Sequence, residues 1–282
     1  MKKKLPLFLL LLCPIFVFSQ NIEVAGGLIA NSINVNEGII SNVANPISAQ
    51  DAATKSYVDL LKAQLATLQG VKDIDNNRYE IVAIGTQMWM AENLKTTRYN
   101  DGTVIPLIPD ISDWCIASTN GNPAYTWSGN ETGNETEGLI RYGALYNWYA
   151  IDGSSNGNKN VCPTGWHVPT DGEWTTLSTF WGGESVAGGK MKEAGLAHWT
   201  SPNTGATNDS GFAGLPGGHQ TAYCGASYDD AGVFGYWWSS TEKDTGGAWY
   251  RVLAHDNGVV GRNFNSDNGK GFGFSVRCLR DD

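Results

Sequence analysis

The chain has little charge, and basic residues are the scarcer kind. Only 17% of its 282 residues are charged, and 19 lysines and arginines stand against 28 aspartates and glutamates, so the formal net charge is −9. A protein this acidic lacks the positive surface with which proteins bind nucleic acids and anionic membranes. We therefore expect no nucleic-acid partner and no acidic-lipid partner.

A long hydrophobic run is also missing after residue 18. The apolar run Leu5–Phe18 follows three lysines and is shorter than the roughly 18 residues that a transmembrane helix needs. With Ser19 before Gln20 as a tolerable cleavage site, this pattern predicts a secretory signal peptide at residues 1–19. We expect a secreted protein, extracellular or at the cell surface, without a transmembrane segment.

Cysteine is scarce too, and its spacing excludes some chemistry. Cleavage of the signal peptide would remove one of the five cysteines and leave Cys115, Cys162, Cys224 and Cys278. An even number in an exported protein favours disulfides, for which three pairings are possible. None of the four lies in a CxxC pair or beside histidines at zinc spacing, so we predict no zinc site.

Catalytic patterns are missing as well. The four histidines, His167, His198, His219 and His255, are dispersed, and no Ser-His-Asp order or pair of carboxylates stands out. The glycine-rich stretches lack the Lys-Ser/Thr of a phosphate-binding loop. Asn208–Asp209 and Asp229–Asp230 are candidate calcium ligands, although hydrated turns use the same residues. We assign no catalytic residue, and no cofactor beyond this candidate calcium.

Glycine and aromatic residues are what the chain has in quantity. It contains 35 glycines, 11 tryptophans and 11 tyrosines. This composition predicts a loop-rich globular fold, since disordered chains are poor in aromatic residues. The length suffices for one or two domains with cores of their own.

Residues 20–75 are predicted to form a stalk. Up to residue 50, apolar residues recur at short intervals among Asn, Ser and Gly, which is typical of short strands without their own core. A helix follows at residues 51–69, where Val58, Leu61, Leu65 and Leu68 have the 3-4-3 spacing of a short coiled coil. The alternative is an amphipathic helix that packs on its own domain. The stretch NVANPISAQDAATKSYVDLL also resembles the shaft-to-helix segments of trimeric phage tail fibres, and this resemblance implies a homotrimer.

From residue 76 the sequence predicts a head domain. An alternating strand begins at Tyr79, and Arg141–Ile151 places aromatic residues on one helical face. Thr170 and Glu173 form a capping box ahead of a helix that Gly182 ends, which gives Glu173 a structural role. His167, just before this box, is predicted to be a hydrogen-bonded framework residue.

A series of motifs runs in order through the head, from about Tyr79 to Asp282: TQMWMAENLKTTRYNDGT, RYGALYNWYA, CPTGWHVPTDGEW, GGKMKEAG, HWTSPNTGATNDSGFAGLPGG, YWWSSTE and GFSVRCLRD. This series resembles the Fibrobacter succinogenes major paralogous domain, or FISUMP domain. The third motif also resembles an element of the formylglycine-generating and sulfatase-modifying enzymes. These enzymes have the C-type lectin fold, so the resemblance implies an α+β, C-type lectin-like head over residues 76–282.

The resemblance suggests two uses for the C-terminal cysteines. The formylglycine-generating enzymes use a pair of cysteines, and the candidates here are Cys224 and Cys278, although nothing in the sequence shows that they converge. A structural disulfide is the simpler use of Cys278, with Cys162 as its candidate partner. An oxidoreductase or modifying enzyme of the formylglycine-generating type stays as the alternative function.

The region from Tyr236 to Cys278 is the candidate binding site. Strand-like pieces at Trp237–Ser239, Ala248–Leu253 and Phe272–Leu279 frame a polar span, and Trp249 is assigned to this scaffold. The candidate ligand-binding residues are Arg251, His255, Asp256, Asn257, Arg262, Asn263, Phe264, Asn265 and Asp267. Such a mixture of amide, charged and aromatic groups suits recognition, whereas the composition alone also fits a solvated loop. In C-type lectin-like domains this late segment faces the ligand.

These patterns predict an adhesin-like protein that binds an extracellular protein or glycan through its C-terminal segment. Some proteins with this architecture are diversified by retroelements that mutate adenines and so change asparagine codons. The asparagines that remain beside Val252, His255 and Phe264 are compatible with that history. A structural surface component without a ligand is a further alternative.

Overall fold

The structure is a computed structural model that describes residues 58, 70–127, 141–224 and 230–281 of the chain. The chain divides into two units, Met1–Tyr57 and Val58–Asp282, and the described residues belong to the second. The predicted signal peptide and the strands of the stalk lie outside the described residues, as does the predicted coiled coil apart from Val58, which is helical. Within the described part of the chain, no helix is long and apolar enough to cross a membrane.

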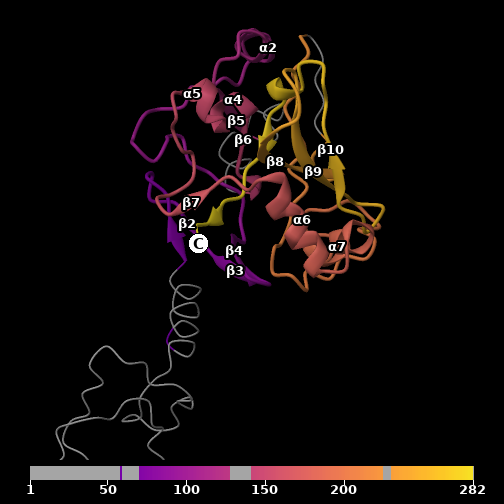
Figure 1. Cartoon of the computed structure of the whole chain (residues 1–282). Coiled ribbons are helices and arrows are strands. Elements are labelled where there is room, and N and C mark those ends of the chain that lie inside the picture. The colour runs from indigo at the N-terminus through magenta and orange to yellow at the C-terminus, as the bar shows by residue number, and fades with distance from the viewer. Residues whose placement is uncertain (1–57, 59–69, 128–140, 225–229, 282) are drawn as a thin grey trace, which may run out of the picture. The chain divides into compact units, whose positions relative to one another are not determined.

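A four-stranded sheet joins the two ends of the head. In spatial order its antiparallel strands are β3 (Ile81–Ile84), β4 (Gln87–Met90), β12 (Leu279–Arg280) and β7 (Trp166–His167). Gly85, with a φ of 62°, makes the tight turn between β3 and β4, where a side chain would be strained. The C-terminus accordingly lies among the indigo strands that begin the head (Figure 1). A short hairpin of β1 (Val71–Lys72) and β2 (Arg78–Tyr79) precedes this sheet.

A six-stranded sheet carries the C-terminal region. In spatial order its strands are β10 (Gly261–Asn263), β9 (Ala248–Ala254), β8 (Phe234–Glu242), β11 (Phe274–Ser275), β6 (Ala144–Tyr146) and β5 (Tyr125–Trp127). All pairs are antiparallel except β11 with β8. The predicted strand at Ala248–Leu253 is confirmed as β9, and β10 stands at the end of the order as an edge strand.

The helices are short and lie between the strands in the chain. They are α2 (Ile111–Thr119), α4 (Trp148–Ile151), α5 (Gly153–Asn156), α6 (Asp171–Phe180), α7 (Glu184–Met191) and the 3-10 turn η3 (Gly269–Gly271). The capping box of Thr170 and Glu173 is confirmed at the start of α6. The helix predicted over Arg141–Ile151 is wrong, because β6 pairs on both sides in the sheet and Asn147 caps a separate short helix.

The predicted closing strand Phe272–Leu279 is also wrong as a single strand. It divides into β11 in the six-stranded sheet and β12 in the four-stranded sheet, and every residue of the segment is buried. Arg277, which is 0% exposed, lies 3.8 Å over the Phe212 ring and donates from Nε to Asn93 Oδ1 at 3.0 Å. Burial lowers the pKa of Arg277 to about 9. The core therefore extends over both faces of this segment.

Two disulfides, Cys115–Cys224 and Cys162–Cys278, cross-link the head. The second is the pair named from the sequence, and it ties the residues just before β7 to those just before β12. Cys224 and Cys278, the pair that an enzyme of the formylglycine-generating type would need, are bound to different partners. The mixture of helices and three sheets in the described residues confirms the α+β class.

Candidate functional site

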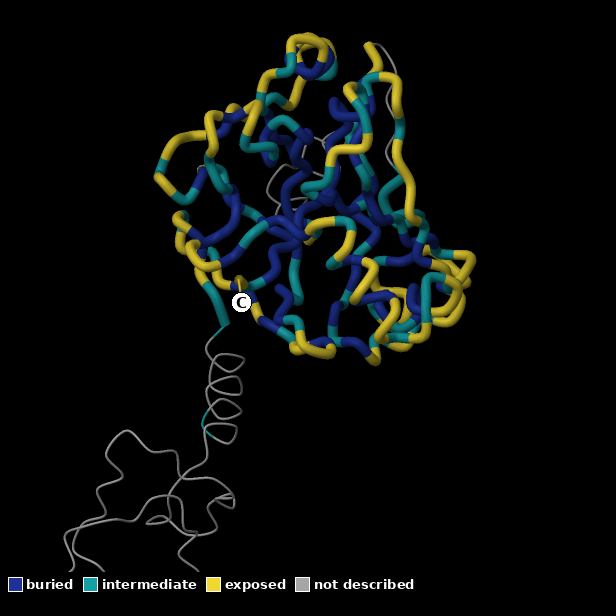
Figure 2. Tube along the Cα trace, viewed as in Figure 1, coloured by how far each residue is buried: buried dark blue, intermediate teal, exposed yellow. Residues whose placement is uncertain are grey.

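The candidate residues begin with Arg251 in β9, and the others lie after β9, in the turn that follows it, in the edge strand β10 and in the loop beyond. Arg251 is fully buried, whereas the other eight predicted residues are partly or fully exposed. Figure 2 shows the exposed stretch at β10 beside the largely buried β9. The segment therefore has one buried anchor and a mostly accessible outer surface, and its two parts are held by different contacts.

Asp171, the first residue of α6, holds two arginines of this segment. Arg251 donates from its NH1 atom to Asp171 Oδ1 at 2.8 Å and from NH2 to the Asp171 carbonyl at 3.0 Å. Arg262 donates from Nε to Oδ1 at 3.0 Å and from NH2 to Oδ2 at 2.7 Å. Burial opposes the charged form of Asp171, but the hydrogen bonds from Arg262 and Arg251 outweigh it and lower its pKa. Arg251 is fully buried and its guanidinium is engaged in this internal ion pair, so the prediction that it lies on a ligand-binding surface is not met.

Four side chains on and around β10 form what we call the cation–aromatic ladder. Lys243, Arg262 and Phe264 are exposed, and Trp249 of β9 is partly exposed. The Arg262 guanidinium lies 3.8 Å from the centre of the Trp249 ring, and the Trp249 and Phe264 rings meet edge to face at 5.1 Å. Lys243 Nζ lies 5.4 Å from the Trp249 ring and 5.3 Å from the Phe264 ring. Phe264 is 38% exposed. The sequence pattern predicts Trp249 as a scaffold residue and gives no sign that Lys243 belongs to the candidate site.

The turn at His255–Asn257 is held from below by a buried lysine. Lys192, which is 0% exposed, donates from Nζ to the carbonyls of Thr204 at 2.9 Å, Ala254 at 2.9 Å and Asn257 at 2.8 Å. Burial lowers its pKa to about 8. His255 Nδ1 lies 3.1 Å from the Ser201 carbonyl, while the side chains of Asp256 and Asn257 are exposed. The lysine fixes the backbone of the turn, and the side chains of Asp256 and Asn257 lie at its surface.

The last part of the segment is fixed by small residues and a side-chain contact. A Cβ atom on Gly246 or Gly247 would collide with the carbonyl of Ser266 or Asn265 respectively, so these glycines allow a close backbone approach. Ser266 Oγ donates to Asp244 Oδ2 at 3.0 Å. Asn263 and Asp267 are exposed and Asn265 is partly buried. This loop is thus shaped by backbone packing against the β8–β9 connection.

The candidate calcium residues do not form a cluster in the described part of the chain. Asn208 accepts the backbone N–H of Ala213 at 2.8 Å, and Asp230 Oδ2 accepts from the Tyr236 hydroxyl at 3.0 Å. Asp229 lies outside the described residues. Among the residues that the structure covers, no group of three or more His, Cys, Asp or Glu side chains could hold a metal ion.

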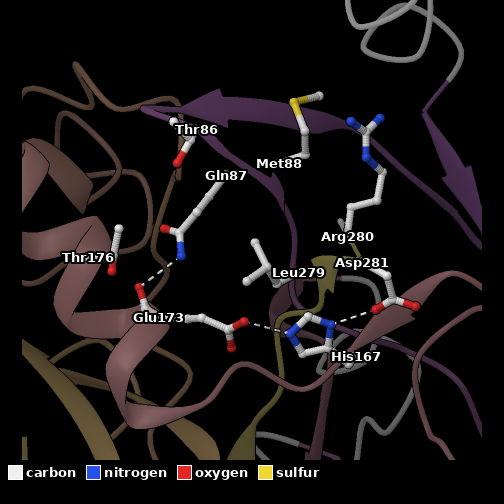
Figure 3. Close-up of a pocket in the computed structure, with 9 residues that line it drawn as sticks. All are labelled: Thr86, Gln87, Met88, His167, Glu173, Thr176, Leu279, Arg280 and Asp281. Atoms are coloured by element: carbon white, nitrogen blue, oxygen red, sulfur yellow. Dashed lines mark hydrogen bonds and ion pairs between the residues drawn. The ribbon is translucent and has the colours of Figure 1, made fainter.

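His167 lies between two carboxylates at a polar hollow (Figure 3). Its Nδ1 is 2.6 Å from Asp281 Oδ1 and its Nε2 is 3.0 Å from Glu173 Oε1. Burial lowers its pKa, but the hydrogen bond with Asp281 and the charge of Glu173 outweigh this effect, so the net shift is upward. With both ring nitrogens engaged, His167 is a hydrogen-bonded framework residue and no free base.

Residues 82–280 of the chain match the family model described as the Fibrobacter succinogenes major domain. No curated protein and no solved structure gives a significant match. The matched range contains both disulfides, the cation–aromatic ladder and the segment that follows β9.

Proposed function

The chain belongs to the Fibrobacter succinogenes major domain family, and we propose that it is a secreted or surface-displayed protein that binds a ligand through the cation–aromatic ladder. The observation that carries this proposal is the ladder itself, an exposed arginine and lysine packed on two aromatic rings at a sheet edge. Aromatic side chains and arginine are enriched where proteins bind other molecules. Because contacts in the protein already hold the side chains, little conformational entropy is lost on binding.

The ligand that we propose is an extracellular protein or glycan. Arginine and lysine offer directional hydrogen bonds to carboxylates and hydroxyls, and Phe264 offers apolar contact area. The neighbouring exposed side chains Asn263 and Asp267 add an amide and an acceptor. An adhesin-like role fits a protein that carries such a patch at the open edge of its sheet.

The architecture that we propose is a C-type lectin-like head on a self-associating stalk, exported by a signal peptide. A parallel coiled coil at residues 51–69 would bring three heads together, so that weak binding by each head gives strong attachment. Measurement of the mass of the mature protein in solution tests the trimer, and a monomer would exclude it. A template repeat and a reverse transcriptase gene beside the coding sequence would support diversification of the segment after β9.

The experiment is a screen of the mature chain on arrays of glycans and extracellular proteins. The variant R262A/F264A removes two rungs of the ladder, and R98A/F180A removes the same residue types elsewhere on the surface. Arg98 is a suitable control because its side chain is 51% exposed and ion-paired with Asp75, and Phe180 is 57% exposed. We expect the wild type and R98A/F180A to bind the same array spots and R262A/F264A to lose this binding. Thermal unfolding curves should show that all three proteins are folded.

Three outcomes would change the proposed function or its site. Equal binding by R262A/F264A and the wild type would remove the ladder from the site. No binding by any of the three proteins would favour a structural surface component. The oxidoreductase alternative needs free thiols at Cys224 and Cys278, and thiol labelling of the native protein that found both reactive would favour it over ligand binding.

A further inference from the structure

A groove that is separate from the cation–aromatic ladder is a second candidate binding site. Its volume is about 390 Å³, within the range of roughly 300–1,000 Å³ that is usual for small-molecule sites. Three segments line it: residues 99–108, residues 117–123 at the end of α2, and residues 155–159 at the end of α5. Its lining shares no residue with the ladder or with the hollow at His167.

Apolar side chains form one part of the groove. Val104, Pro106 and Ile108 line it from alternate positions of one segment, as side chains on one face of an extended chain do. Ile108 also packs on the buried cluster that contains Ala117, the lining residue of α2. Val104 is 62% exposed, and Pro123 completes the apolar lining. Apolar side chains that line a concave, accessible surface favour a ligand with a hydrocarbon part.

One cation lies beside the residue with which the first lining segment begins. Lys159 Nζ lies 5.6 Å from the centre of the Tyr99 ring and donates to the Asn156 carbonyl at 3.2 Å. Tyr99 and Asn156 both line the groove, so the ammonium lies at its wall. An ammonium has three N–H donors, and this neutral carbonyl engages one of them. Among the residues that the structure describes, Lys159 forms no ion pair, so its charge is available to a ligand.

The lining of the groove contains no negative side chain that would balance Lys159. Burial raises the pKa of Tyr99 to about 12, so its hydroxyl is neutral at pH 7. Asp101 lies outside the lining and accepts from the backbone N–H of Thr103 at 2.8 Å. This hydrogen bond lowers the pKa of Asp101 more than the charge of Lys159 does, and the described structure contains no ion pair between the two side chains. The charge that complements the groove is therefore negative.

We propose that the groove binds a linear aliphatic carboxylate. Its carboxylate pairs with Lys159 near Tyr99, and its hydrocarbon chain runs along Val104 and Ile108 to Ala117. Residues 104–108 span at most roughly 13 Å at about 3.3 Å per residue, which accommodates a chain of about eight carbons. An alkylammonium would place a second cation beside Lys159, and an alcohol would not form the stronger, charge-assisted hydrogen bond.

The test is a ligand-observed NMR titration of the full mature chain with octanoate. Octylammonium reverses the charge, octan-1-ol removes it, and acetate lacks the hydrocarbon chain. We expect octanoate to bind with a Kd below about 10 mM and about tenfold more tightly than each of the other three, because each of them lacks one of the two contacts. Equal or tighter binding of any of the three, or no saturable binding of octanoate up to about 10 mM, would overturn the proposal.

A lysine variant locates the carboxylate in the groove. K159Q removes its proposed partner. K190Q is the matched control, because Lys190 also lies over an aromatic ring, at 5.2 Å from that of Trp181, and also bonds one backbone carbonyl. We expect K159Q to weaken octanoate binding about tenfold and to leave octan-1-ol binding unchanged, whereas K190Q should change neither. Unchanged octanoate affinity in K159Q would overturn the assignment.

A valine variant tests the apolar part of the groove. V186S is the control for V104S, because Val104 and Val186 are 62% and 50% exposed and Val186 lies outside the lining. We expect V104S to weaken octanoate binding about threefold and V186S to leave it unchanged. R262A/F264A should bind octanoate as the wild type does, so the result does not depend on the ladder. Equal affinities of V104S and V186S, or loss of octanoate binding in R262A/F264A, would place the octanoate site outside the groove. If K159Q fails to fold, this pair of valine variants decides.

Discussion

The two parts of the segment after β9 are held by different side chains. The turn at His255–Asn257 is fixed through its backbone, because Lys192 binds the carbonyls of Ala254 and Asn257. The strand at Arg262–Phe264 pairs with β9 through its backbone and is also held by a side chain, because Arg262 binds Asp171 and packs on Trp249. The sequence alone gives the two parts the same polar, exposed character.

This difference predicts which exposed side chains can be substituted and which also stabilise the segment. A side chain at Asp256 or Asn257 can change without loss of the bonds from Lys192 to the backbone of the turn. A change at Arg262 alters the surface and also removes a contact that positions β10. If the segment is diversified, we therefore expect variation to be tolerated in the turn and to carry a structural cost in the ladder.

The largest effect is expected for D171A, which removes the carboxylate shared by the two arginines. Arg251 would keep its bond to the Asp171 carbonyl but would be a buried cation without its counter-ion. Breaking a buried ion pair costs about 3–5 kcal/mol. Urea unfolding at pH 7 should show a loss in this range, and a loss below about 1 kcal/mol would contradict the anchoring role.

The same carboxylate predicts a dependence on pH. The pKa of Asp171 is lowered in the folded protein from an ordinary value of 3.8, so its contribution to stability is present above that value. It is lost as the pH falls through the lowered pKa, where the native carboxylate takes up its proton. We expect the wild-type unfolding free energy to fall more steeply than that of D171N below pH 3.8. Parallel curves for the two proteins would show that Asp171 does not contribute.

A somewhat smaller loss is expected for K192M, which tests the other part of the comparison. The substitution leaves the carbonyls of Thr204, Ala254 and Asn257 without their donor, and unsatisfied buried acceptors cost about 1–3 kcal/mol in such cases. We expect a loss of about 2–3 kcal/mol in urea unfolding, with faster hydrogen exchange in the turn. K190M is the matched control, since Lys190 is partly exposed and has one weak bond of 3.4 Å to the Trp181 carbonyl. Equal losses of unfolding free energy in K192M and K190M would show that Lys192 has no specific role in holding the turn.

Local patterns in the sequence predicted some elements well. The apolar, strand-like run Ala248–Leu253 predicted strand β9, and Thr170 with Glu173 predicted the start of α6. Each of these signals depends only on residues that are close together in the sequence. The α+β class and the family followed from motifs of this kind. Where the pattern depended on distant partners it failed, as in Phe272–Leu279, which two different sheets divide between them.

The candidate site was predicted only in part, because its contacts also join residues that are far apart in the sequence. Arg262 and Phe264 are exposed as expected, but Arg251 is buried on a carboxylate 80 residues away in the chain. Lys192 reaches Asn257 across 65 residues. No periodicity or spacing reports a contact of that length, so a single sequence could not distinguish an anchor from a surface residue.

A still smaller change in stability is expected for R262A. Its ion pair with Asp171 is partly exposed, and pairs of this kind together with an exposed cation–aromatic contact contribute about 1 kcal/mol. Asp171 keeps Arg251 as a partner, so no buried charge is stranded. We expect the free energy of unfolding in urea to fall by about 1 kcal/mol. Relative to the wild type, hydrogen exchange should become faster in β10 and change less in β9. A loss as large as that of D171A would show that Arg262 belongs to the core and not to the ladder.

The smallest effect is expected for D256S/N257S, at the exposed positions of the turn. Asn257 donates to Asp256 and accepts from the backbone N–H of Val259, but both contacts lie at the surface. Lys192 binds the Asn257 carbonyl, which any residue supplies, so the backbone of the turn should stay in place. We expect the unfolding free energy to change by less than about 0.5 kcal/mol, and the exchange protection of the turn to match the wild type. The triple variant K192M/D256S/N257S should then be no less stable than K192M, and a further large loss would mean that the side chains of Asp256 and Asn257 also hold the turn.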